Sequence, residues 1–192
     1  MQNKTVKLFA LGALAVATTF AASAENTYDY FVGFDAGTHV DGEFEYKAEG
    51  YSATLVENNS PIIGLSGGAI INDHHRVKFG LAYDALTIAD STDDETYSRM
   101  DMTASYDFML PIANRLNWTV GAHMGYEFFE SDADNLNGFT YGVQTGLDYK
   151  LTRDWSLGTE VAYTEHEKDE WGTSSLQIDN DVILTANVQY HF

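Results

Sequence analysis

The 192-residue chain has no cysteine, two prolines and few basic residues. Without cysteine, a disulfide framework and any thiolate metal site are excluded. Ten lysines and arginines stand against 29 aspartates and glutamates, and two of the ten, Lys4 and Lys7, lie in a segment that we expect to be removed. The mature chain then carries a formal charge of −21 (8 − 29). Because phosphate binding needs clustered lysine and arginine, this charge argues strongly against nucleic acid as a partner.

Long apolar runs are also missing. Lys4 and Lys7 precede the apolar stretch 8–16, and a small-residue cleavage site, Ala22-Ser23-Ala24, follows it. This stretch is shorter than the ~20 residues that a membrane-spanning helix needs. Residues 1–24 therefore match a secretory signal peptide, with a mature domain over residues 25–192. The mature chain is either soluble outside the cytoplasm or crosses a membrane as strands.

Apolar and polar residues alternate with a period of two in the mature chain, which predicts strands with one apolar and one polar face. We expect strands at 28–36, 63–71, 77–83, 100–110, 116–128, 139–151, 155–163 and 184–192. Short connections (72–76, 111–115, 152–154) alternate with long polar ones (41–61, 90–98, 130–138, 165–175). This pattern is typical of an all-β, eight-stranded antiparallel transmembrane up-and-down β-barrel with short periplasmic turns and long extracellular loops.

Alternation does not tell which face lines the lumen, and a lipocalin-like soluble barrel would put the apolar face inside. Two features favour an apolar exterior. The polar face is rich in glycine, as expected for a narrow lumen filled by side chains. Aromatic residues of the apolar face lie near the strand ends, where a membrane barrel has its two interfaces. The expected aromatic girdle comprises Tyr30, Phe108, Trp118, Tyr126, Phe128, Phe139, Tyr141, Tyr149, Trp155, Tyr163 and Tyr190.

One ion pair is expected inside the lumen. If Leu110 faces Leu116 across the short turn, paired residue numbers sum to 226 and Arg99 lies opposite Glu127. An unpartnered arginine would be costly in a confined lumen, so we predict a direct guanidinium–carboxylate pair. In the alternative, both groups extend into water, where a pair contributes ~0–1 kcal/mol. The other polar residues expected in the lumen are Asp35, Asp84, Asp101, His123, Gln144 and Glu160.

The last residues carry a family resemblance. Val188 and Tyr190-His191-Phe192 resemble the C-terminal signature by which outer-membrane barrels are recognised for assembly. The whole mature chain resembles the small eight-stranded barrels of the OmpA-transmembrane, OmpX and Ail kind, without a peptidoglycan-binding domain after Phe192. The resemblance implies the outer membrane of a Gram-negative bacterium, contact with outer-membrane lipid, and recognition of Phe192 by the barrel assembly machinery. Roles in the family range from structural to adhesive or immune-evading.

Charge placement separates the two ends of the expected barrel. Arg76, Lys78, Arg115, Lys150 and Arg153 are expected at or beside the periplasmic turns, whereas most acidic residues fall in the long outer loops. The preferred interpretation of a strongly negative outer mouth is that its acidic loops are solvated and resist aggregation. It also suits an irregular divalent-cation site or an unknown surface ligand.

No catalytic, cofactor or metal motif is apparent. A deacylase would need His166 beside Ser174 or Ser175, and we interpret His166 as a solvated loop residue. Adjacent residues such as His74 and His75 rarely converge on one metal ion. The expected protein is therefore a non-enzymatic, monomeric barrel without a cofactor that anchors acidic extracellular loops, in a structural or surface-interaction role. The alternatives are a narrow ion-conducting channel and, less favoured, a lipid-modifying enzyme.

Overall fold

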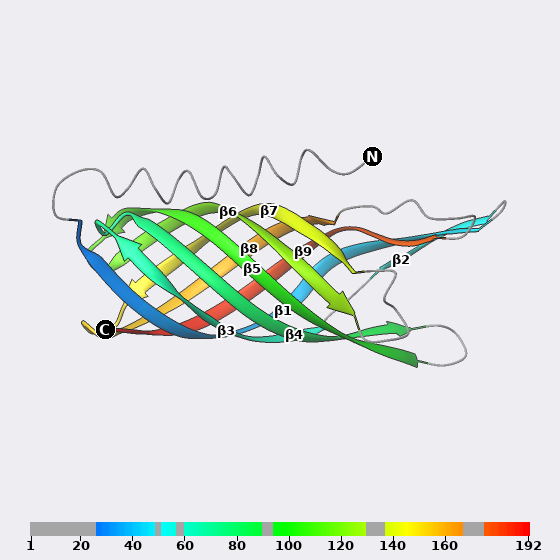
Figure 1. Ribbon diagram of the computed structural model, residues 1–192, viewed down its shortest axis with the longest axis horizontal. Coiled ribbons are helices and arrows are strands. Elements are labelled where there is room, and N and C mark those ends of the chain that lie inside the picture. The colour runs from blue at the N-terminus through cyan, green and yellow to red at the C-terminus, as the bar shows by residue number, and fades with distance from the viewer. Residues whose placement is uncertain (1–25, 49–50, 57–59, 90–93, 130–136, 167–174) are drawn as a thin grey trace.

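The computed structural model describes residues 26–48, 51–56, 60–89, 94–129, 137–166 and 175–192. Nine antiparallel strands in these residues form one sheet: β1 (Tyr28–Ala48), β2 (Tyr51–Val56), β3 (Pro61–Ile71), β4 (His75–Ala89), β5 (Asp94–Ala113), β6 (Leu116–Phe129), β7 (Gly138–Lys150), β8 (Trp155–His166) and β9 (Ser175–His191). β1 also pairs with β9, so β1 and β3–β9 close into a barrel (Figure 1). The predicted eight-stranded antiparallel barrel is thus confirmed. No helix among the described residues is long and apolar enough to cross a membrane.

The start of β1 and the C-terminus lie at the same end of the barrel, and the opposite end is here called the outer end (Figure 1). The three short turns, 72–74, 114–115 and 151–154, link strands at the end that holds the start of β1 and the C-terminus. Asn72, Asp73 and Arg115 have positive φ there, of 53°, 61° and 69°. Asn and Asp tolerate this left-handed conformation better than most residues, which suits the first turn.

Several strands continue past their predicted limits toward the outer end. β1 runs to Ala48 and forms a hairpin with β2, so the prediction of a loop over 41–61 is wrong there. β9 begins at Ser175 and β5 at Asp94, where loops were also predicted. Antiparallel pairing rests on backbone hydrogen bonds and does not require an apolar face, so the strands continue into these acidic segments.

The predicted register between β5 and β6 is wrong by two residues. Paired numbers sum to 228, so that Arg99 faces Phe129 and Asp101 faces Glu127. The strands continue to a two-residue turn, where Ala113 faces Leu116 with a sum of 229, and a β-bulge between Pro111 and Ala113 then brings the sum to 228. Proline has no N–H to donate to the ladder, and a bulge inserts an unpaired residue at such a position.

The two faces of the wall differ as the alternation predicted. The apolar residues of the alternating pattern are exposed along every barrel strand, as at Leu65, Phe79 and Val143. The alternating residues of the opposite face are buried and mostly polar. A few apolar residues are buried as well, and three of them, Phe31, Ile70 and Met109, form a small cluster near the end that holds the C-terminus. The barrel therefore has a lipid-like exterior and a polar, filled interior.

Candidate functional site in the barrel lumen

Charged side chains from six strands form a closed chain across the outer part of the lumen, which we call the outer ring. All its members are buried. In the order of their strands round the wall, they are His39 (β1), Asp84 (β4), Arg99 (β5), Glu127 (β6), His166 (β8) and Asp181 (β9). Acids and bases alternate, so that each carboxylate lies between two bases.

Each member of the outer ring contacts the next, and the last contacts the first. The separations are His39 Nε2–Asp84 Oδ2 2.8 Å, Arg99 Nε–Asp84 Oδ2 3.1 Å, Arg99 Nη1–Glu127 Oε1 3.1 Å, His166 Nδ1–Glu127 Oε2 3.0 Å, His166 Nε2–Asp181 Oδ2 3.6 Å and His39 Nδ1–Asp181 Oδ2 3.2 Å. Buried charges without partners are costly, and the ring supplies every member with an oppositely charged or polar neighbour.

Arg99 joins more groups than the single pair that the sequence predicted. Its guanidinium contacts Glu127 diagonally, because Glu127 stands directly opposite Asp101. The same group donates to Asp84 on the other neighbouring strand, and its Nε lies 3.6 Å from Asp101. Its Cζ also lies 5.9 Å from the ring centre of Phe129. Arg99 is 1% exposed, so the alternative in which it extends into water is wrong.

A second polar group, the inner network, occupies the middle of the lumen. Arg76 donates to Asp107 at 2.8 Å and to Glu160 at 3.2 Å, and Lys78 donates to Glu160 at 3.1 Å. Gln144 completes the network by donating to Asp107 at 2.6 Å. The prediction that placed Arg76 and Lys78 at or beside the periplasmic turns is therefore incomplete, since both side chains point inward and neutralise buried carboxylates.

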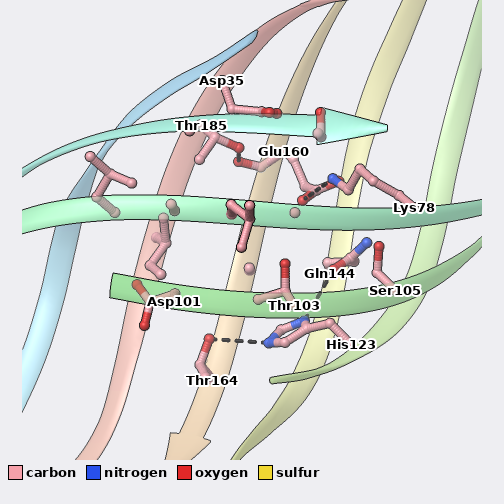
Figure 2. Close-up of a pocket in the computed structure, with 18 of the residues that line it drawn as sticks. Asp35, Lys78, Asp101, Thr103, Ser105, His123, Gln144, Glu160, Thr164 and Thr185 are labelled. Carbon is pink, nitrogen blue, oxygen red and sulfur yellow. Dashed lines mark hydrogen bonds and ion pairs between the residues drawn. The ribbon is translucent and has the colours of Figure 1, made fainter. Parts of the chain in front are cut away.

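A small cavity of about 130 Å³ lies between the outer ring and the inner network. Figure 2 shows the predicted lumen residues around it, including Asp35, Asp101, His123, Gln144 and Glu160. The ring of His123 bridges Gln144 Oε1 at 3.0 Å and Thr164 Oγ1 at 3.2 Å, so that it fills the lumen as a hydrogen-bonded side chain. A cavity of this size, lined by polar side chains, holds a few waters and is smaller than the roughly 300–1,000 Å³ of typical small-molecule sites.

His166 is the largest correction to the sequence-based site. Its interpretation as a solvated loop residue is wrong, because it ends β8 and is 9% exposed. His39 and Asp181 were missed altogether, since both lie outside the predicted strands. A usable signal was present, because each continues the inward parity of its strand, after Asp35 in β1 and before Thr185 in β9.

The predicted girdle residues lie on the outer face of the wall. Ten of them are exposed, and Tyr126 is half-buried because it packs against Phe128 and Phe139, with ring centres 4.8 and 5.1 Å apart. Their role at the membrane interfaces stays a prediction. Asp73, His74 and His75 do not converge: His75 Nδ1 pairs with the Tyr106 hydroxyl at 2.7 Å.

A third polar group joins β1, β7, β8 and β9 at the end of the barrel that holds the C-terminus. His191 Nε2 lies 2.9 Å from Ser156 Oγ, and His191 Nδ1 lies 3.0 Å from Asp29 Oδ1, which also accepts through Oδ2 from Lys150 at 2.8 Å. The order of atoms matches a Ser–His–Asp hydrolase triad. However, Ser156 has no exposed surface, and no cavity described above reaches it. The group therefore fits a structural clasp between β1, β7, β8 and β9.

A closed wall with an apolar exterior and a polar, filled lumen defines a membrane-spanning β-barrel. The family model for the outer membrane protein beta-barrel domain matches residues 8–192, and the chain belongs to this family. Comparison with curated proteins gives no significant match.

Solved barrels of the same fold support this assignment. Neisserial surface protein A is 19% identical, with a TM-score of 0.59 over 85% of this chain and 97% of that one. OprG from Pseudomonas aeruginosa is 13% identical, with a TM-score of 0.58 over 88% and 96%. AlkL, solved in lipid bilayers, is 16% identical, with a TM-score of 0.60 over 89% and 93%. At these identities the likeness extends to the fold.

Phe192 should matter for assembly more than for stability. Its side chain is 70% exposed and its N–H donates to Tyr30 O at 2.9 Å, a backbone bond that substitution of the side chain retains. We expect Phe192→Ala to lower the amount of folded barrel in cells but to leave the unfolding midpoint of refolded protein almost unchanged. Phe79→Ala, at a similarly exposed outward position, is the control and should keep its cellular yield. Equal yields for the two variants would contradict the assembly role.

Proposed function

We propose that this barrel is a non-conducting anchor in the outer membrane that holds acidic loops at the cell surface for structural or binding roles. The observation that carries the proposal is the filled lumen. The outer ring, the inner network and the Phe31 cluster lie one below another along the barrel axis. An eight-stranded barrel has no room for a channel unless these side chains move away.

Conductance in planar bilayers tests the anchor directly. The purified barrel should show no stable open state at neutral pH, because the ion pairs of the outer ring and the inner network block the axis at two levels. A variant that removes the inner network, Arg76→Ser with Lys78→Ser, should conduct no better while the outer ring remains intact. A stable, ion-selective open state of the parent protein would replace the anchor by the narrow-channel alternative.

The loop chemistry supports a cationic surface partner. Four acids, Asp90, Asp93, Asp94 and Glu95, fall in the sequence between the end of β4 and the first residues of β5. We expect calcium binding, measured by calorimetry on the folded barrel in micelles, to weaken when these four become Asn and Gln. Asp73→Asn with Asp154→Asn, at the opposite end, is the matched control and should leave binding unchanged. Equal weakening by both variants would point to nonspecific counterion binding.

A further inference from the structure

The outer ring contains two histidines whose four ring nitrogens all lie beside carboxylate oxygens. We propose that His39 and His166 are both held as imidazolium and that the ring is a pH-operated clasp, which tightens the outer end of the barrel when the two histidines are protonated and releases it when they are not. This inference is independent of the anchoring role, since it concerns the mechanics of the wall.

Contact geometry is the first support. A neutral imidazole has a hydrogen on one nitrogen and a lone pair on the other. His39 Nε2 lies 2.8 Å from Asp84 Oδ2 and His166 Nδ1 lies 3.0 Å from Glu127 Oε2, both within hydrogen-bond distance. The other nitrogen of each ring lies beside Asp181 Oδ2, at 3.2 Å for His39 Nδ1 and 3.6 Å for His166 Nε2, as an ion-pair contact without hydrogen-bond geometry. A carboxylate oxygen therefore lies beside both nitrogens of each ring, and this arrangement attracts the positive charge of an imidazolium from two sides.

Charge balance is the second support. Four carboxylates meet here, those of the outer ring and Asp101, which faces Glu127 across β5 and β6. Arg99 is their one permanent cation. With neutral histidines the group carries a formal charge of −3, and with two imidazolium rings it carries −1. Since net charge buried away from water is costly, protonation of both histidines lowers the energy of the closed ring.

Arg99 acts against protonation of one histidine. Its Nη2 lies 2.7 Å from His39 Nε2, because both donors point at Asp84 Oδ2. The remaining neighbours are uncharged: the chain at His39 donates to Ser60 O, and Thr140 of β7 stands opposite His166. His39 thus faces two carboxylates and one guanidinium, and His166 faces two carboxylates. At both positions the attraction of the two carboxylates outweighs the repulsion of the guanidinium, so an imidazolium ring is favoured.

The direction of the pH effect follows from linkage. An unperturbed histidine titrates near pH 6.5, and the unfolded chain behaves in this way. The clasp gives its full stabilisation of the folded barrel at pH values where His39 and His166 are protonated in both the folded and the unfolded chain. This stabilisation falls as the pH rises to the range where the folded barrel loses the two protons. Six of the eight barrel strands are joined by the ring, so its release loosens the outer end, while the inner network has no ring histidine and stays closed.

Histidine-selective NMR of the folded barrel in micelles tests the protonation directly. At about pH 7.5 His39 and His166 should both show hydrogens on both ring nitrogens. A neutral His39 that accepts from Arg99 Nη2, or a His166 with a hydrogen on one ring nitrogen alone, would overturn the proposal.

Urea unfolding of variants tests the clasp. The difference in midpoint between the parent and His39→Gln/His166→Gln should shrink by at least half between about pH 6 and about pH 10. His123→Gln is the matched control, because this lumen histidine has amide and hydroxyl partners, and its difference from the parent should not shrink as the pH rises over the same range. A difference independent of pH for the double variant would also overturn the proposal. The NMR result on the parent decides the matter if the variant does not fold.

Discussion

Replacing Arg99 with methionine should lower the free energy of unfolding by about 3–5 kcal/mol, the usual cost of removing one partner from a buried ionic group. Methionine keeps much of the length of the side chain and removes the charge. Asp84 and Glu127, which are 0% and 5% exposed, then lose the guanidinium that lies between them. Urea unfolding in micelles, followed by the heat-modifiable gel mobility of the folded barrel, measures the change.

Arg153→Met is the control, since Arg153 is an exposed residue of a turn and its loss should change stability by less than about 0.5 kcal/mol. Adding Asp84→Asn to Arg99→Met should restore part of the stability, because one of the two carboxylates that lost the guanidinium is then uncharged. An Arg99→Met barrel as stable as the Arg153→Met barrel would mean that the outer ring carries no net stabilisation.

Gly142→Ala should nearly abolish the folded barrel in cells. An added Cβ would overlap the carbonyl oxygen of Tyr163 on the next strand and would lie 2.7 Å from His123 Cε1. Neither group can move freely, because one is backbone and the other is held by hydrogen bonds on both ring nitrogens. The strands therefore cannot approach as they do in the native wall. The measurement is the folded fraction in the outer-membrane extract, scored by gel mobility.

A glycine on the opposite face provides the comparison. At Gly67 the nearest atoms to an added Cβ are Phe31 O at 3.5 Å and Val32 Cγ1 at 3.9 Å, which is ordinary contact. Gly67→Ala should fold with the parent's yield. Similar yields for the two alanine variants would show that the wall can adjust to a Cβ inside the lumen.

Period-two alternation was sufficient to predict the eight barrel strands, whereas the glycine-rich polar face and the aromatic residues near the strand ends predicted the apolar exterior. Alternation works where one face meets lipid and the other meets the lumen, as in residues 184–192. At the outer ends, acidic residues such as Glu43 and Glu45 instead predicted a long polar loop. Phe44 and Tyr46 nevertheless alternate with them, so the period of two continues in the sequence of the outer part of β1.

The candidate site was predicted in part. Parity alone put Arg99 and Glu127 inside the lumen, and the structure places them in contact despite the wrong register. A long guanidinium side chain tolerates a two-residue shift because it reaches diagonal neighbours. The contact between His39 and Asp84 could not be predicted, since β3 separates their strands and their approach depends on the diameter of the closed barrel. The diameter of a closed barrel cannot be predicted from a local pattern in the sequence.

The pairing of β1 with β9 has a consequence for the time course of folding. It joins Phe31 to His191, which are 160 positions apart in the chain (191 − 31), whereas the other pairings join strands that lie near each other in sequence. Closing a loop of that length costs about 4 kcal/mol in chain entropy by the logarithmic rule. Hairpins can form early, but the cylinder cannot close until the last strand is available, and until then both edge strands have unpaired N–H and C=O groups. The nascent barrel is therefore most exposed to pairing with a second copy just before its final strand docks.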